Sequence, residues 1–318
     1  MKLIHAPHLD RYVVLGGRRR PTSYARRLRL PTLLGTDIPP PPAMTSYETA
    51  AMTALRRMFV NDTLGDCVIA GRGHRIGILT ANAGSPFVYT DAQILTEYER
   101  IGSYNPSDPS TDQGCDMSTA ADDGVSKGYA DGSKDAGWID VDATNRMQVM
   151  QAIELFEDGD IGFELPAAWV DSMPSADDFV WDVAGDPVPD YGHCVQIVDY
   201  DDTRGVRIST WGLLGWLTWP ALAKYGARAA FGELIIHVNS DQIIKATQKA
   251  PNGFDWAKLV TFFDEMGGKV PMPAPAPTPA PPHPAPTPVP PAPAPTVVTL
   301  AQAQAWAAAG LAASWPKH

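Results

Sequence analysis

The segment that decides the fold spans residues 61–70 and reads Asn61-Asp62-Thr63-Leu64-Gly65-Asp66-Cys67-Val68-Ile69-Ala70. Cys67 opens an apolar run that continues to Leu79, and this run predicts a helix over residues 67–82. A cysteine at a helix N-terminus lies near the positive end of the helix dipole and near free backbone N–H groups, which favours its thiolate form. Asp66, directly before it, is expected to cap the first turn.

A second segment, far along the chain, provides a histidine. It reads Tyr191-Gly192-His193-Cys194-Val195. Residues 193–198 have the composition of a β-strand, so His193 is expected to project from a strand. A cysteine on a helix and a histidine on a strand are the arrangement by which one large group of thiol hydrolases builds a nucleophile–base pair.

A third segment completes a family pattern. It reads Ser209-Thr210-Trp211-Gly212 and follows the first two in order. Together the three segments resemble the papain-like cysteine peptidase superfamily, in which a glutamine, a cysteine, a histidine and an Asn-Ser-Trp-Gly segment occur in this order. The match is best with a poorly characterised bacterial and bacteriophage branch that shares Gly-Asp-Cys, Gly-His and Thr-Trp-Gly. The resemblance covers residues 46–268 and implies an α+β, two-lobed fold with a helical lobe and an antiparallel sheet lobe.

The resemblance also implies roles for individual residues. Cys67 would be the nucleophile and His193 the general base and acid, with Trp211 shielding the histidine from water. Asn61 and the backbone N–H of Cys67 would hold the oxyanion, and Ser209 would orient His193. Asn61 stands where the family has a glutamine, and Ser209 stands where it has an asparagine.

These two departures leave two functions open. The first is a thiol hydrolase that cleaves peptide or amide bonds in a peptide or protein substrate. The second is a catalytically weak or inactive papain-like domain that binds rather than cleaves, such as a phage-associated structural component tethered by its C-terminal tail. Selective labelling of Cys67 by a thiol-directed probe would separate the two.

Other candidate chemistry is weaker. His74 lies seven residues after Cys67, about 10.5 Å along a helix axis, too far for proton transfer, and is expected to be buried in the core or between the lobes. Cys115 and Cys194 are expected to be small buried residues, with a Cys67–Cys115 contact left open. No zinc ligand spacing, calcium loop or phosphate-binding glycine loop is found, so no cofactor or metal is expected.

Charge is unevenly distributed along the chain. The net charge is −11, yet residues 1–35 carry +7 and the rest therefore −18. The basic arm, residues 1–45, is expected to be solvated or folded back on the domain; no aromatic–basic interleaving supports nucleic-acid binding. No apolar run is long enough for a membrane span, and the N-terminus lacks the apolar core of a secretory signal. The composition therefore predicts a cytoplasmic or virion-associated protein with no membrane partner.

Periodicity gives the expected elements. Helices are predicted over residues 46–57, 67–82, 91–101 (capped by Thr90 or Asp91), 116–127 and 146–156. Strands are predicted over residues 138–141, 161–165, 193–200, 206–211 and 233–238. This order, with helices first and an antiparallel sheet later, is typical of α+β folds.

The C-terminal region has a different composition. Residues 269–296 are rich in proline and predict an extended linker that cannot join a core. Residues 297–318 predict a short helix over 300–309 that carries Trp306, with Leu311 and Trp315 after it. Such a short tail cannot bury this apolar surface alone, so it is expected to dock on a protein partner, on the parent domain or on a second copy.

Overall fold

The computed structural model describes residues 1–24, 29–30 and 40–239. All of them belong to the first of two structural units, residues 1–272. The predicted linker, residues 269–296, and the predicted docking helix within residues 297–318 lie outside the described residues.

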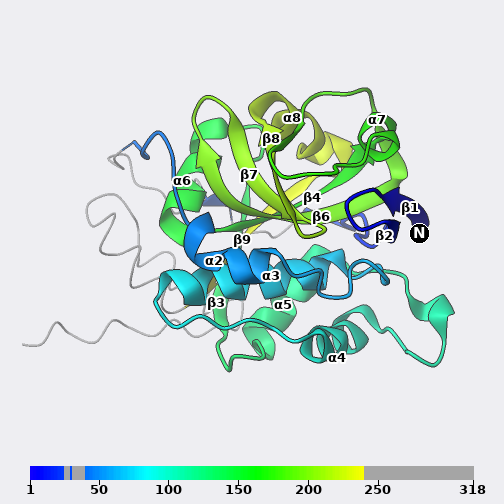
Figure 1. Cartoon of the computed structure of the whole chain (residues 1–318). Coiled ribbons are helices and arrows are strands. Elements are labelled where there is room, and N and C mark those ends of the chain that lie inside the picture. The colour runs from blue at the N-terminus through cyan, green and yellow to red at the C-terminus, as the bar shows by residue number, and fades with distance from the viewer. Residues whose placement is uncertain (25–28, 31–39, 240–318) are drawn as a thin grey trace, which may run out of the picture. The chain divides into compact units, whose positions relative to one another are not determined.

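A seven-stranded mixed sheet forms the centre of the described region (Figure 1). Its spatial order is β3-β9-β4-β6-β7-β8-β5, and every neighbouring pair is antiparallel except β5–β8. The strands are β3 (Asp135–Val141), β4 (Gly159–Pro166), β5 (Phe179–Trp181), β6 (Pro187–Asp201), β7 (Gly205–Thr210), β8 (Leu213–Thr218) and β9 (Glu233–Asn239). Strand β6 pairs with both β4 and β7, and the histidine that it carries lies opposite Phe163 of β4.

The helices fall into two groups along the chain. The first group is α2 (Glu48–Leu55), α3 (Cys67–Asn82), α4 (Asp91–Gly102) and α5 (Met117–Ser126). The second is α6 (Arg146–Phe156), α7 (Ala167–Asp171) and α8 (Trp219–Tyr225), with two 3₁₀ turns at Pro109–Thr111 and Arg228–Ala230. In Figure 1, α2 to α5 gather on one side of the sheet and α7 and α8 on the other. An α+β fold with a helical region and a largely antiparallel sheet is therefore confirmed.

Helix α3 is the central helix of the first group. Every residue from Cys67 to Leu79 is buried, although the helix contains two arginines. The Nε of Arg72 donates to Glu97 of α4 at 2.8 Å, and Arg75 pairs with Asp135 of β3 at 3.3 Å. A buried cation requires such partners, and removing one partner of a buried pair is strongly destabilising. The two pairs therefore fix α3 between α4 and the sheet.

The described part of the basic arm is folded back on the domain. Strands β1 (Lys2–Ala6) and β2 (Arg11–Leu15) form an antiparallel hairpin. Ile4, Val13 and Leu15 belong to the same hydrophobic core as the sheet. After the hairpin, the Gly16 N–H donates to the Gly192 carbonyl at 3.0 Å. The described part of the arm is therefore folded back on the domain, which is one of the two arrangements expected for it.

Most predicted elements are confirmed within a few residues. The helices over 67–82 and 146–156 have the predicted bounds, and Thr90 caps α4 in a reciprocal capping box with Gln93. The prediction that the Asp66 side chain caps α3 is wrong, because its carboxylate makes no capping hydrogen bond. Strands β1, β2, β5 and β8 and helices α7 and α8 were not predicted.

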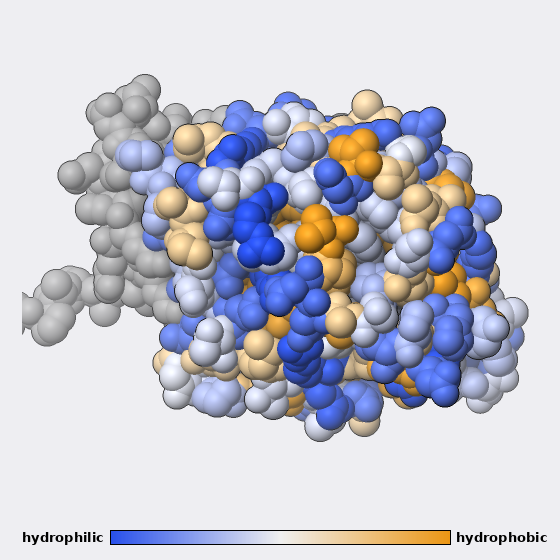
Figure 2. All heavy atoms as spheres, turned by 45° about the horizontal axis from the view of Figure 1, so that its top comes forward, coloured by the Kyte–Doolittle hydropathy of each residue, from blue (hydrophilic) through white to orange (hydrophobic). Residues whose placement is uncertain are grey.

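The surface that Figure 2 presents is mostly hydrophilic, with hydrophobic residues in small separate groups. Among the described helices, none combines the length and the hydropathy that crossing a bilayer requires.

Candidate active site

Cys67 is the first residue of α3 and is 3% exposed. Cys194, the residue that follows His193, lines the same small cavity as Cys67. Burial raises the pKa of the Cys67 thiol to about 12, and the nearby Asp66 carboxylate also raises it, whereas the backbone N–H of Cys194 and the charge of Arg18 lower it. The expectation that the helix terminus favours the thiolate is therefore wrong for this conformation, because desolvation outweighs the helix dipole.

His193 lies in β6 and is 1% exposed. Its Nε2 makes a 2.8 Å hydrogen bond with the Thr210 hydroxyl, and its ring stacks on Trp211 at 4.2 Å between ring centroids and 11° between planes. Its Nδ1 has no hydrogen-bond partner among the residues that the structure describes. Burial lowers the pKa of His193 to about 3, so the ring is neutral near pH 7.

The two hydroxyls of the third motif have different partners. The Ser209 hydroxyl donates to the Leu55 carbonyl of α2 at 3.0 Å, whereas the hydroxyl on His193 belongs to Thr210. Successive residues of a strand point to opposite faces, so only one of the two reaches the imidazole. The prediction that Ser209 orients His193 is therefore corrected to Thr210.

Asn61 closes the loop that leads into α3. Its Nδ2 donates to Asp66 at 3.1 Å and to the Leu64 carbonyl at 3.3 Å. Asp66 is fully buried, and burial raises the pKa of its carboxyl well above the ordinary value. In this conformation the Asn61 amide is engaged within its own loop, and its role as an oxyanion donor remains a prediction.

A small cavity of about 10 Å³, with room for about one water molecule, joins these segments. It is lined by Cys67 and Asn61 on one side and by Ser209, Thr210 and Trp211 on the other. The structure thus brings together residues from α3, its preceding loop and β7. His193 is connected to this group through Thr210 and Trp211.

His74 also lines this cavity but has a structural role. Its Nε2 makes a 2.9 Å hydrogen bond with the Arg57 carbonyl, and its ring contacts Phe59 at 4.9 Å between centroids. Burial lowers the pKa of His74 to about 4. The prediction of a buried histidine in the core is confirmed.

The segment after β2 covers the start of α3. A methyl group on Gly17 would overlap the Gly65 carbonyl, and one on Gly65 would overlap the Met1 sulfur. The backbones of Gly17 and Gly65 are therefore in direct van der Waals contact two residues before Cys67. This cover and the wall formed by Cys194 explain why the thiol is inaccessible.

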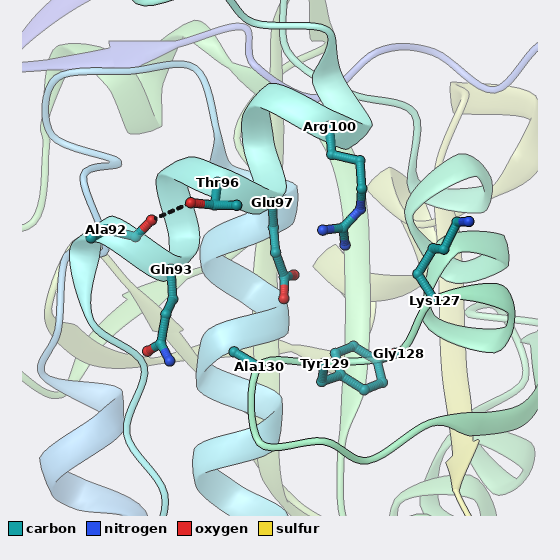
Figure 3. A pocket seen from close by; sticks show the side chains of 9 residues that line it. All are labelled: Ala92, Gln93, Thr96, Glu97, Arg100, Lys127, Gly128, Tyr129 and Ala130. Carbon is teal, nitrogen blue, oxygen red and sulfur yellow. Dashed lines mark hydrogen bonds between the residues drawn. The ribbon is translucent and has the colours of Figure 1, made fainter.

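A second, larger cavity of about 380 Å³ opens between α4 and residues 127–130 (Figure 3). Arg100, Glu97 and Tyr129 point into it from opposite sides. Arg100 is already held by both carboxylate oxygens of Asp123, at 3.0 and 2.7 Å. None of the predicted catalytic residues lines this cavity, so it is separate from the candidate active site.

The three cysteines are buried free thiols, as expected for Cys115 and Cys194. No cluster of three or more His, Cys, Asp or Glu side chains within residues 1–24, 29–30 and 40–239 is arranged to hold a metal ion.

Comparison with solved structures identifies the class of fold. The chain is similar to xylellain, a cysteine protease from Xylella fastidiosa, with a TM-score of 0.53 and 12% identity over 75% of this chain and 98% of that one. It is also similar to the digestive procathepsin L2 proteinase from the larval midgut of Tenebrio molitor, with a TM-score of 0.50 and 12% identity over 70% of this chain and 78% of that one. The fold is therefore that of papain-like cysteine proteases. The sequence matches no protein-family profile and no curated protein.

Sequence reasoning missed the hydroxyl of Thr210 as the partner of His193. Thr210 could have been found from strand alternation, because Trp211 and the residue before it flank the imidazole while Ser209 faces α2.

Proposed function

We propose that the protein is a papain-like thiol hydrolase that cleaves peptide or amide bonds in a peptide or protein substrate. The observation that carries the proposal is the small cavity that Cys67 shares with Thr210 and Trp211, the two residues that hold the His193 ring. The Nδ1 of that ring has no hydrogen-bond partner within the described residues. A nucleophile beside a base that a third group orients is the arrangement on which thiol catalysis depends.

The proposed reaction follows from the hydrogen bonds of the imidazole. When the Nε2–H of His193 donates to the Thr210 oxygen, the lone pair of Nδ1 is free to take the thiol proton of Cys67. The thiolate then attacks the substrate carbonyl carbon, and N–H groups of the first turn of α3 stabilise the oxyanion. The imidazolium returns its proton to the leaving amine, and water, deprotonated by the same nitrogen, hydrolyses the thioester.

The arm must move before this reaction can proceed. Cys67 is 3% exposed, and the backbones of Gly17 and Gly65 pack directly against each other. A substrate carbonyl cannot approach the sulfur through that contact. Displacing the arm would admit water and substrate, lower the pKa of the thiol and raise that of the imidazole, since burial causes both shifts.

A second candidate function, a binding or structural domain without turnover, is favoured by one observation. The Asn61 amide, the only predicted side-chain donor for the oxyanion, donates to Asp66 and Leu64 instead. An amide held in this way stabilises the loop and does not donate a hydrogen bond to an oxyanion. In that case the papain-like fold would serve recognition alone.

Covalent labelling separates the two functions. The full chain and its Gly17→Ala variant, in which the arm is loosened, are incubated with a peptidyl epoxide probe at mildly acidic pH, and the labelled peptides are identified by mass spectrometry. The proposal expects stoichiometric labelling at Cys67, with Cys115 and Cys194 as internal controls of the same residue type and similar burial. Labelling that fails in both chains, or that does not distinguish the three cysteines, would leave the binding function.

A further inference from the structure

Two arginines of the arm reach buried carboxylates. Arg18 is 3% exposed, and its Nη2 donates to Glu233 of β9 at 2.8 Å and to the Phe231 carbonyl at 2.6 Å. The side chains of Arg18 and Glu233 are both fully buried. Arg20, two residues later, donates to both oxygens of Glu164 of β4 and stacks on the Phe231 ring at 4.0 Å. Its partner Glu164 is 2% exposed.

The two carboxylates lie on the sheet at a spacing that matches that of alternate side chains in an extended peptide. Glu233 pairs with Gly162 across β9 and β4, and Glu164 lies two residues beyond Gly162 along β4. Residues two apart on a strand share a face and lie about 6.8 Å apart, which is also the spacing of alternate side chains in an extended peptide. Gly162 leaves the space for the guanidinium, since a methyl group there would lie 2.7 Å from the Arg18 Nε.

The backbone of the arm passes beside the active site and forms one isolated β-bridge, in which Arg18 pairs with Cys115. The N–H groups of Gly16 and Arg18 donate to the Gly192 carbonyl at 3.0 and 3.5 Å, and Gly192 directly precedes His193. On the other side, the Cys115 N–H donates to the Gly17 carbonyl and the Arg19 N–H to the Cys115 carbonyl, both at 2.9 Å. An extended peptide could form the two hydrogen bonds with Cys115 whatever its side chains, so these bonds favour extended backbone without selecting a sequence.

We propose that this groove, formed by Gly192, Cys115, Glu233 and Glu164, is a binding site for an extended peptide with arginines at two alternate positions, and that residues 16–20 occupy it in cis. The inference rests on the proposed function in that the peptide is the substrate segment bound next to Cys67. The selectivity lies in the side chains. Glu233 and the Phe231 carbonyl accept from one guanidinium, and Glu164 accepts from two nitrogens of the other.

Arginine suits these positions better than lysine. The guanidinium of Arg20 donates from two nitrogens to the two oxygens of Glu164, a planar fork that the compact and strongly hydrated ammonium of lysine cannot reproduce. At Arg18 both hydrogen bonds come from Nη2, and an empty groove would take this buried cation away from Glu233, which is unfavourable. The acidic body of the chain, with a formal charge of −18 outside residues 1–35, also attracts basic segments. All three effects favour an Arg-X-Arg segment over a neutral one.

Peptide binding tests the groove without relying on catalysis. A full chain with Cys67→Ala, Arg18→Ser and Arg20→Ser is mixed with a fluorescent peptide that has the sequence of residues 16–21. A matched peptide has serine in place of both alternate arginines. Anisotropy should show at least about tenfold tighter binding of the arginine peptide, because it forms charge-assisted hydrogen bonds with the buried carboxylates that the serine peptide lacks. A chain with Cys67→Ala alone, whose groove is filled, should bind the peptide more weakly.

Adding Glu233→Gln to the triple variant should remove most of the preference for arginine. Equal affinity for the two peptides, unchanged preference after Glu233→Gln, or no binding of either peptide by the triple variant would overturn the proposal. Should Arg18→Ser prevent folding, as judged by thermal melting, the comparison is made with Arg20→Ser and Glu164→Gln, because the side chain of Arg20 is 40% exposed. Because Cys67 is absent from every chain, a negative result counts against the groove, and failed labelling of Cys67 counts separately against the hydrolase.

Discussion

Replacing Thr210 by valine removes the hydroxyl that contacts the His193 ring at 2.8 Å and keeps the shape of the side chain. Ser209→Ala is the matched control, because it removes a neighbouring buried hydroxyl of the same strand, whose partner is the Leu55 carbonyl at 3.0 Å. Each substitution deletes one buried hydrogen bond and leaves one polar atom unpaired. The two variants therefore lose the same kind of interaction. They differ only in which group is left without its partner, the His193 ring nitrogen or the Leu55 carbonyl.

The effect on stability should be similar in both variants. Losing a buried neutral hydrogen bond and leaving its partner unsatisfied costs about 2 kcal/mol. For a unit of this size that lowers the melting temperature by roughly 4–8 °C. The effect on the histidine should differ. Only Thr210→Val frees the imidazole to change tautomer, and this would move the proton from Nε2 to Nδ1, the nitrogen that must accept the thiol proton.

Two measurements test this reasoning. The ¹⁵N chemical shifts of labelled histidine report which nitrogen carries the proton, and the rate of peptide hydrolysis, or of Cys67 labelling, reports the base. We expect Thr210→Val to alter the His193 signal and to slow the reaction at least about tenfold, a range typical of groups that support general base catalysis. Ser209→Ala should leave both unchanged. An unaltered His193 signal in Thr210→Val, or an equally slow Ser209→Ala, would refute the assignment of Thr210 as the positioning residue.

Three further perturbations have defined outcomes. Cys67→Ala should keep the fold, with a melting temperature within a few degrees of the parent, and should abolish probe labelling and any turnover; residual turnover would identify a different nucleophile. Gly17→Ala should loosen the arm, since the new methyl group overlaps the Gly65 carbonyl, and should raise the rate of Cys67 alkylation by iodoacetamide at least about tenfold; an unchanged rate would show that the arm does not limit access. His74→Gln should make stability less dependent on pH, because burial lowers the pKa of His74 from 6.5 to about 4. The neutral ring stabilises the fold above pH 6.5. About 3 kcal/mol of that contribution is lost as the pH falls to 4. Urea unfolding between pH 7 and 4 should show the difference, and identical pH slopes for parent and variant would contradict it.

The sequence predicted the features that depend on local pattern. The apolar run after Cys67 and the run at 146–156 gave helices with the observed bounds, since a buried helix needs a nearly continuous apolar sequence. The order of the cysteine, histidine and tryptophan motifs predicted the fold that the solved structures share. These signals lie within single elements or in their order, and they need no knowledge of how the elements pack.

The remaining features depend on contacts between distant segments. The hairpin at residues 2–15 was not predicted, because the basic residues of the arm left open whether it is solvated or folded back, whereas Val13 and Leu15 pack in the core. Ser209 was chosen by its position in a motif, but the pairing of β7 determines which hydroxyl reaches His193. The ionisation of Cys67 was inferred from the helix dipole alone, although the burial that opposes it comes from β6 and the arm. In each case the deciding neighbour lies far away in the sequence.

In the proposed mechanism, the energetics of the closed site indicate which step would limit the reaction. At pH 7 a thiol of pKa about 12 must be deprotonated at a cost of about 7 kcal/mol, and an imidazole of pKa about 3 must be protonated at a cost of about 5 kcal/mol. Even two opposite unit charges as close as about 4 Å would attract each other by only about 4 kcal/mol at an effective dielectric of 20. Burial therefore favours the neutral forms of both groups. In the proposed mechanism, displacement of the Gly16–Arg20 segment is the step that admits water and favours the ion pair, and a basic peptide that competes for Glu233 and Glu164 would promote that step as it binds.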